Sequence, residues 1–104
     1  MDIIMTKFNN KDLDGLGKLV HPDIIIRNLE NNSIIAEGKE AMLNFYRELF
    51  ENDCSTNTIV EMMTLEDKVV FTEHIKEPYG TAQDEFNMME FENGLIKRIW
   101  FLEE

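Results

Sequence analysis

The sequence predicts an α+β fold in which helices come early along the chain and an antiparallel sheet comes late. Helical patterns of apolar residues dominate the first half, and four strand-like segments follow one another after residue 57. The late connections are too short to hold helices, so these strands are expected to run antiparallel and not as a doubly wound parallel sheet. With 104 residues, 43% of them hydrophobic, residues 1–104 are expected to form one domain around one core.

Two short helices are predicted at the beginning of the chain. The first covers residues 2–8, where Asp2 can cap the first turn. The second covers residues 11–20, whose leucines recur on one face at helical spacing. Pro22 disfavours helical backbone at the residue before it, so we expect this helix to stop near His21.

A pair of strands and a third helix come next. Residues 24–29 and 34–36 are rich in β-branched side chains and predict two strands, joined by a polar turn at 31–33. Gly38 then precedes a helix that runs to about Glu51. The broad apolar stripe of this helix consists of Ala41, Met42, Phe45, Tyr46, Leu49 and Phe50.

Four strands complete the predicted sheet. They cover residues 58–65, 68–76, 81–92 and 95–102. Turn-like connections at 66–67 and 78–80 join the first three of these strands. Asn93-Gly94 is typical of a two-residue hairpin loop, because both residues tolerate a positive φ.

The charge balance excludes two classes of partner. Ten Lys and Arg residues against 21 Asp and Glu residues give a net charge of −11, which repels phosphate backbones and anionic lipid surfaces. We therefore expect neither nucleic acid nor membrane as a partner. No apolar run approaches the roughly 20 residues that span a bilayer, and no signal-peptide pattern is visible, so a cytoplasmic location is expected.

Several kinds of chemistry find no support in the sequence. Cys54 is the only cysteine, and its acidic neighbours would raise a thiol pKa, which disfavours a nucleophile. The two histidines have no ligand partners at metal-binding spacing, and the five glycines are scattered singly. We therefore expect no metal and no cofactor.

One carboxylate occupies an unusual place in the predicted strand 68–76. Alternation places Val69, Phe71, Glu73 and Ile75 on one face and Val70, Thr72, His74 and Lys76 on the other. Among apolar neighbours, Glu73 would have a raised pKa, as a general acid or base often has. The alternatives are that Glu73 lies at a solvent-exposed edge of the sheet, or that it pairs with Arg27 or Arg98. A one-residue shift in register would turn His74 inward instead.

Four loose motifs together resemble a known family. They are Asp-Leu-Asp-Gly at 12–15, His-Pro-Asp at 21–23, Gly-x-x-Ala at 38–41 with Phe45-Tyr46, and Asn-Gly-x-Ile at 93–96. Their order resembles the SnoaL-like and ketosteroid-isomerase-like branch of the nuclear transport factor 2-like superfamily. The resemblance implies a cone-shaped α+β barrel, in which three helices pack on a strongly curved, mostly antiparallel sheet and enclose a pocket.

The ketosteroid isomerase template does not carry its chemistry over to this chain. The resemblance places the carboxylate base at Asn28, the protonated Asp at Asn87 and the catalytic Tyr at Ile4. An amide cannot take up a proton at neutral pH, so Asn28 cannot act as the base. Asn28 and Asn87 then either form a polar spot in an apolar pocket or satisfy backbone groups at strand bends.

The resemblance implies a pocket for a small, mostly apolar molecule. Its expected walls are Ile24, Ile26, Phe45, Val69, Phe71, Met89, Ile99 and Phe101, with polar contacts from Asn28, Asn87 and Glu73. Glu73 is the one acid or base that we place inside, and an isomerase, lyase or hydratase step on a small carbonyl compound is the expected reaction class.

A non-catalytic dimerising module is the competing interpretation. Its cavity would be filled by its own side chains, and its outer sheet face would carry an apolar patch. Phe86, Met88 and Trp100 are the expected members of that patch, through which we expect a homodimer in either case.

Overall fold

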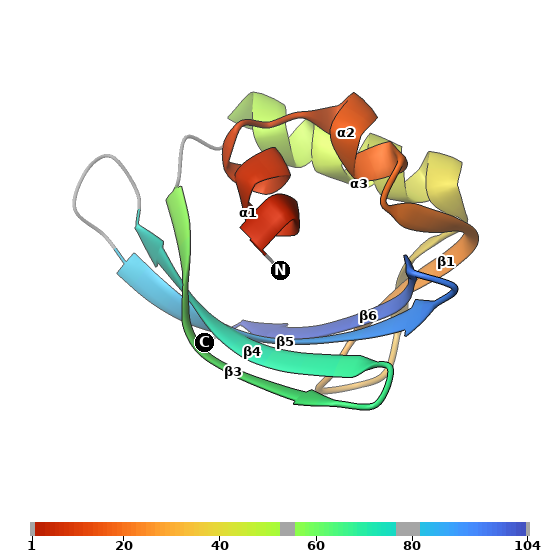
Figure 1. Cartoon of the computed structure of the whole chain (residues 1–104). Coiled ribbons are helices and arrows are strands. Elements are labelled where there is room, and N and C mark those ends of the chain that lie inside the picture. The colour runs from red at the N-terminus through yellow and green to blue at the C-terminus, as the bar shows by residue number, and fades with distance from the viewer. Residues whose placement is uncertain (1, 53–55, 77–81, 104) are drawn as a thin grey trace.

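The structure is a computed structural model that describes residues 2–52, 56–76 and 82–103, and within these ranges it contains three helices and six strands (Figure 1). Their order along the chain is α1 (Asp2–Asn9), α2 (Leu13–Gly17), β1 (Val20–Asn28), β2 (Ile34–Glu37), α3 (Lys39–Asn52), β3 (Thr56–Leu65), β4 (Lys68–Lys76), β5 (Ala82–Glu92) and β6 (Leu95–Glu103). The predicted α+β class is confirmed. Cys54 and the predicted turn at 78–80 both lie outside the described ranges.

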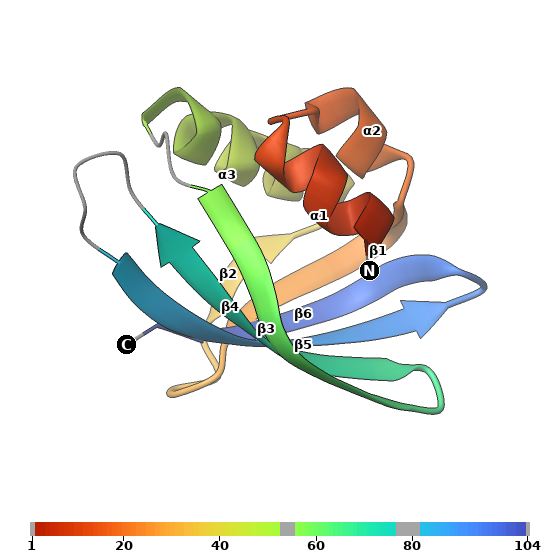
Figure 2. The ribbon, with the colours of Figure 1, turned by 60° about the vertical axis from the view of Figure 1, so that its left-hand side comes forward.

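The six strands form one curved sheet in the order β2-β1-β6-β5-β4-β3. Every neighbouring pair is antiparallel except β1 and β6, which run parallel. The sheet does not close on itself, so β2 and β3 remain as its two edges. The three helices lie over the concave side, and α1 and α3 are both above it in two views (Figures 1 and 2). The mostly antiparallel, strongly curved sheet expected from the sequence is therefore confirmed.

The second helix is shorter than the sequence predicts. The expected range was 11–20, but α2 runs only from Leu13 to Gly17. Asp12 begins the helix, because its side-chain Oδ1 accepts a 3.0 Å hydrogen bond from the backbone N–H of Gly15. Asp12 therefore caps the helix, whereas a helix over the predicted range 11–20 would contain Asp12 in its first turn.

Pro22 lies inside a strand and does not end the helix. Val20 already pairs with Ile96 across β1 and β6, so the expected helix end near His21 is wrong. The register of this pair shifts between Val20 and Ile25, and Pro22 falls within that irregular stretch. A proline that lacks an N–H is tolerated where the ladder is interrupted, which explains its place in β1.

The late strands agree with the prediction to within two residues, and the boundaries of β4 agree fully. The three hairpin loops in the described part of the chain each use a positive φ angle. Asn32 has φ 60° between β1 and β2 and Glu66 has φ 56° between β3 and β4, whereas Asn93 and Gly94 have φ 53° and 81° between β5 and β6. Two successive positive angles match the primed turn that suits the twist of a hairpin.

The core fills the space between the concave face and the helices. Its most deeply buried side chains are Ile24, Ile26, Met42, Phe71 and Ile96. Helix α3 packs against β1 and β2, while α1 approaches the start of β3. No helix in the described part of the chain is long and apolar enough to cross a membrane.

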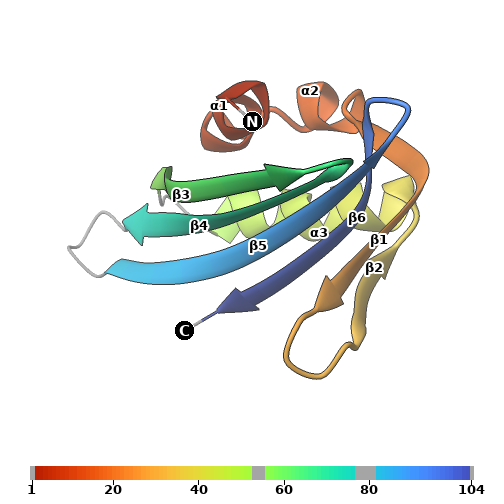
Figure 3. The same cartoon turned by 60° about the horizontal axis from the view of Figure 1, so that its bottom comes forward.

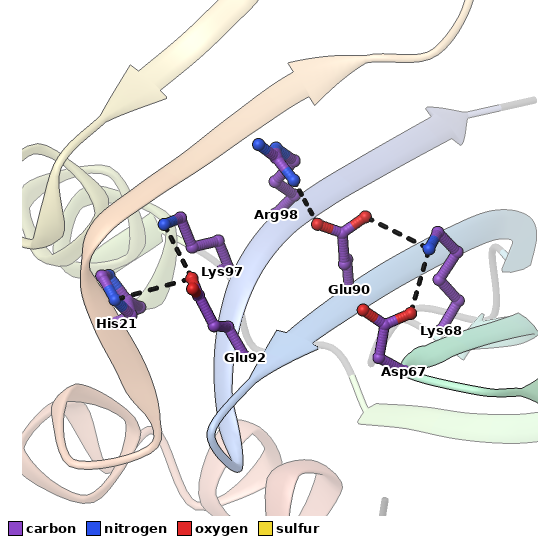
Figure 4. A network of polar contacts seen from close by, with 7 residues as sticks. All are labelled: His21, Asp67, Lys68, Glu90, Glu92, Lys97 and Arg98. Carbon is purple, nitrogen blue, oxygen red and sulfur yellow. Dashed lines mark hydrogen bonds and ion pairs between the residues drawn. The ribbon is translucent and has the colours of Figure 1, made fainter.

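The convex side of the sheet faces away from all three helices (Figure 3). A cross-strand row of charges lies there, in which Lys68 on β4 is 3.5 Å from Glu90 on β5 and Glu90 pairs with Arg98 on β6 (Figure 4). The same view shows Glu92 between Lys97, at 2.7 Å, and His21 of β1, at 3.8 Å.

Candidate functional site

A small cavity lies between α1, α3 and the concave face of the sheet. Its volume is about 40 Å³. The lining consists of Ile4, Met5, Phe8, Leu16, Val20, Met42, Tyr46, Glu73, Asn87, Met89, Ile96 and Ile99. The walls are apolar except for one carboxyl, one amide and one phenol. A space of this size holds a few water-sized molecules, because one water needs roughly 10–15 Å³ measured in this way.

Glu73 is the acidic group of this cavity, and it projects from β4 with only 5% of its surface exposed. Its Oε1 accepts a 2.8 Å hydrogen bond from Nδ2 of Asn87, and its Oε2 accepts one of 2.8 Å from Nδ2 of Asn57. Burial raises the pKa of the Glu73 carboxyl, and the Asn57 hydrogen bond opposes that rise. The inward orientation predicted from strand alternation is confirmed.

The alternative environments expected for Glu73 do not occur. Arg27 donates to the backbone carbonyl of Asn32, and Arg98 pairs with Glu90 on the convex face. No described Lys or Arg forms an ion pair with Glu73. Among the described residues, its charge is therefore stabilised by two neutral amides and not by a cation. The pKa of the carboxyl thus depends on its burial and on these hydrogen bonds.

The register of three strands brings the two amides to Glu73. Ile59 on β3 and Glu85 on β5 lie directly opposite Glu73. Asn57 and Asn87 are each two residues away from those positions, so both approach Glu73 diagonally on the same face. Diagonal neighbours in a sheet are about 7–8 Å apart at the backbone, a distance that an Asn and a Glu side chain together can bridge.

Tyr46 of α3 covers this group from the helical side. Burial raises the pKa of its phenol well above the ordinary value of 10.0, and the charges of Glu85 and Glu73 raise it further. The phenol therefore keeps its proton and can act as a hydrogen-bond donor. Edge-to-face contacts with Phe8 at 5.6 Å and Phe45 at 5.1 Å hold the ring in place.

Asn57 is the site residue that the sequence analysis missed, because residues 52–57 were expected to form a loop. Its side chain is 7% exposed, and its backbone forms two hydrogen bonds with the side chain of Asn9. Extending the alternation of β3 back from Ile59 would have placed Asn57 on the inner face. No pattern in the sequence pairs it with Asn9.

The structure brings together four of the eleven predicted pocket residues in the cavity lining. These are Glu73, Asn87, Met89 and Ile99. Six others belong to the surrounding apolar core but do not line the cavity, namely Ile24, Ile26, Phe45, Val69, Phe71 and Phe101. Ile4, which the resemblance aligns with the catalytic Tyr, also lines the cavity.

Asn28 lies outside the cavity lining. Its Oδ1 accepts hydrogen bonds from the backbone N–H groups of Glu30, at 2.9 Å, and Asn31, at 3.4 Å. The side chain therefore stabilises the turn between β1 and β2. This corrects the expectation of a polar contact deep in the pocket. The side-chain oxygen of Asn28 accepts hydrogen bonds from the backbone of the adjacent turn and does not line the cavity.

Within 2–52, 56–76 and 82–103, no group of three or more His, Cys, Asp or Glu side chains is placed to hold a metal ion. His74 pairs instead with Asp84 at 2.9 Å on the exposed side of the sheet.

The fold and the site define a class of protein, a cone-shaped α+β domain whose helices and curved sheet surround an acid-containing cavity. The chain belongs to the SnoaL-like domain family, whose family model matches residues 4–99. The resemblance found in the sequence is thus confirmed. Among curated proteins, none matches this chain.

Solved structures of the same fold are similar over nearly the whole chain. A candidate ketosteroid isomerase from Kribbella flavida has a TM-score of 0.87 at 13% identity, over 99% of this chain and 73% of that one. A candidate polyketide cyclase from Sinorhizobium meliloti has a TM-score of 0.83 at 15% identity, covering 96% and 90%. The candidate polyketide cyclase IdmH from Streptomyces antibioticus has 0.83 at 18%, covering 99% and 88%. Identities this low establish a common fold and nothing more.

Proposed function

We propose that this SnoaL-like domain binds a small, mostly apolar molecule in the cavity beneath α1 and uses Glu73 as a general acid or base. The reaction class is an isomerase, lyase or hydratase step on a small carbonyl compound. The observation that carries the proposal is a buried carboxyl in an apolar cavity, hydrogen-bonded through both oxygens to Asn57 and Asn87 and paired with no Lys or Arg among the described residues.

The chemistry of the site fits proton transfer. A raised pKa brings the Glu73 carboxyl closer to the working pH, where an acid–base catalyst is most effective. Each carboxylate oxygen has two lone-pair positions, so the two amides leave room for a substrate proton. The protonated phenol of Tyr46 lies in the same lining and would donate to an oxygen that gains negative charge.

The size of the cavity requires that it open for a ligand. Pockets for small molecules usually have about 300–1,000 Å³, far above the 40 Å³ measured here. Helix α1 supplies Ile4, Met5 and Phe8 to the lining and has only eight residues, a length that is marginal without tertiary contacts. Met42 and Met89 add flexible side chains that can repack. We propose that displacement of α1 admits the ligand.

One of the proposed reaction classes, isomerisation, also occurs among the names of the similar structures. The similar structures carry the names of a candidate isomerase and of candidate cyclases, and each is a protein with this fold. These names support the choice of small carbonyl compounds for a first screen of substrates.

Native mass spectrometry of the protein after exposure to an extract of its host is the first test. A bound mass that is retained in wild type identifies the ligand, and turnover is then compared in wild type and Glu73→Gln. Glu73→Gln should lower kcat by about 10²–10⁴-fold, the usual contribution of a general acid or base. Glu37→Gln, at an exposed position of β2, is the matched control. Full activity in Glu73→Gln would refute the assignment.

A second candidate function, a non-catalytic dimerising module, is favoured by the convex face. Met63, Val70, Met88 and Trp100 follow one another across β3, β4, β5 and β6, and we name these four residues the convex row. Met63 is 66% exposed, and no described helix covers the row. Phe86 lies beside it, opposite Thr72. A two-fold contact between two such rows would bury this apolar surface.

Light scattering coupled to size-exclusion chromatography tests the dimer. Met63→Lys together with Met88→Lys should convert a dimer into a monomer, because both changes place charge in the convex row. Ile34→Lys, on the opposite edge strand β2, is the control and should leave the mass unchanged. A wild-type monomer at high concentration would refute the interface. A dimer without any ligand or turnover would favour the module over the enzyme.

A further inference from the structure

The side chain of Asn9 joins helix α1 to the edge strand β3 through two hydrogen bonds. Asn9, the last residue of α1, donates from Nδ2 to the backbone carbonyl of Asn57 at 3.0 Å and accepts at Oδ1 from the backbone N–H of Asn57 at 2.9 Å. The side-chain amide thus satisfies both backbone groups of one residue, as a neighbouring strand would. Because β3 is an edge strand, no further strand competes for these groups.

Asn57, whose backbone is hydrogen-bonded to α1, also forms a hydrogen bond with Glu73. The side chain of Asn57 donates 2.8 Å to Oε2 of Glu73, and this contact is buried. Asn57 therefore connects two parts of the cavity through separate atoms, its backbone to α1 and its side chain to the carboxyl. We propose that Asn57 is a positioning residue through which the placement of α1 determines the protonation state of the Glu73 carboxyl.

The inference rests on the proposed function, because it concerns the same carboxyl and the same movement of α1. With α1 in place, Asn57 donates to Glu73 and favours the charged carboxylate. When α1 moves away to admit a ligand, the backbone of Asn57 loses its two hydrogen bonds to Asn9 and the donation weakens. The carboxyl then holds its proton more tightly. When α1 closes over a ligand, the Asn57 hydrogen bond forms again and favours the charged carboxylate, which is the form that acts as a base.

The surroundings of Glu73 make the Asn57 contact decisive. Glu85 lies directly opposite Glu73 on β5, and burial is what disfavours the charged carboxylate. Tyr46 of α3 is neutral, and the α1 residues in the lining are apolar. Among the described groups that contact Glu73, the amides of Asn57 and Asn87 are the donors that favour its charged form.

Asn57 can also serve the protonated acid. Its Oδ1 is buried and accepts from no group in the described part of the chain. A half-turn of the amide would present this oxygen to the carboxyl, where it could accept from a protonated Glu73. The same side chain can therefore act as donor to the carboxylate and as acceptor from the acid.

The test is a direct titration of Glu73 by carbon-detected NMR in protein labelled with ¹³C-glutamate. Asn57→Ala should raise the pKa of Glu73 by about one unit, because a donor to the charged form is lost. Asn9→Ala should raise it in the same direction by less, and the double variant should match Asn57→Ala alone, because both changes act through one contact. Asn10→Ala, at the exposed neighbouring position, is the control and should change nothing.

Two results would overturn the inference. The first is an unchanged Glu73 pKa in Asn9→Ala when Asn57→Ala raises it, since α1 would then not act through Asn57. The second is an unchanged pKa in Asn57→Ala. If Asn9→Ala does not fold, Asn9→Gln moves the amide by one methylene and replaces it under the same criteria. This readout needs no substrate, so shifted pKa values with full turnover in Glu73→Gln would refute the proposed function alone.

Discussion

The side-chain amide of Asn87 on β5 donates a 2.8 Å hydrogen bond to Oε1 of Glu73 on β4, diagonally across the concave face of the sheet. Both side chains are almost fully buried and both line the cavity. Asn57 completes the arrangement from β3, on the other side of Glu73. In the described part of the chain, a charge on Glu73 is supported by these two neutral amides and by no cation, so each donor matters for the stability of the fold and for the acidity of the carboxyl.

Removing the Asn87 donor should destabilise the protein. Asn87→Leu leaves one oxygen of a buried carboxyl without its partner, and the free energy of unfolding should fall by about 1–3 kcal/mol. Urea denaturation at pH 7 measures this change. Asn44→Leu, at an exposed position of α3, should cost less than about 0.5 kcal/mol. Equal losses in the two variants would show that the buried hydrogen bond is not the cause.

The pH dependence of stability should reveal Glu73. Burial raises the pKa of this carboxyl above its ordinary value of 4.5, so the folded protein binds the proton more tightly than the unfolded chain does. The contribution of Glu73 is therefore fully present below about pH 4.5 and is lost as the pH rises through the raised value.

Glu73→Gln removes this titration. The difference in unfolding free energy between wild type and Glu73→Gln should thus fall from pH 4.5 upward and then become constant. Denaturant melts at half-unit pH steps measure the difference, in which the other carboxylates cancel. Parallel curves across the whole range would contradict a raised pKa at Glu73.

Truncating a lining methionine should enlarge the cavity. Met42 of α3 is 1% exposed, and Met42→Ala should lower the free energy of unfolding by about 2–5 kcal/mol, because the neighbouring side chains close the new space only partly. Met62→Ala, at an exposed position of β3 outside the convex row, is the matched control and should change stability by less than about 0.5 kcal/mol.

The enlarged cavity should also bind small apolar probes. Thermal melts of Met42→Ala with benzene or indole should show a larger rise in Tm than wild type shows, because binding to the folded state stabilises it. The absence of any effect in Met42→Ala would argue that the cavity collapses instead of opening.

Two glycines should respond in opposite directions to the same substitution. Gly94 has φ 81° in the β5–β6 turn, and a Cβ there meets nothing within 4 Å, so Gly94→Ala should cost about 1 kcal/mol from backbone strain alone. Gly17 ends α2 with a Cβ position 3.7 Å from both methyl groups of Leu43. Gly17→Ala should stabilise by about 0.4–1 kcal/mol through the unfolded state. Thermal unfolding measures both, and a loss at Gly17 would contradict this account.

Local rules in the sequence account for much of the fold and for part of the site. Strict alternation in β4 placed Glu73 among inward apolar residues, and the structure agrees because burial acts on every second residue of a strand. Asn93 and Gly94 predicted their hairpin because their backbone preferences are intrinsic. Residues 11–20 were assigned to one helix because their spacing is helical, yet Val20 joins β1 once β6 is present to pair with it.

Local patterns in the sequence are enough to predict the order of the elements and the inner face of β4, and they indicate an acid among the buried residues, because these depend on residues close together in the chain. The surroundings of that acid depend on contacts between distant parts of the chain. Asn57 and Asn87 reach Glu73 only through the register of three strands, and Asn9 reaches Asn57 across 48 residues of chain. The sequence predicts the same pocket role for Asn28 and Asn87. In the structure, the side chain of Asn28 forms a hydrogen bond within a nearby turn, whereas that of Asn87 forms one with the buried Glu73. Register and long-range packing carry no local signature, so they emerge only when the chain has folded.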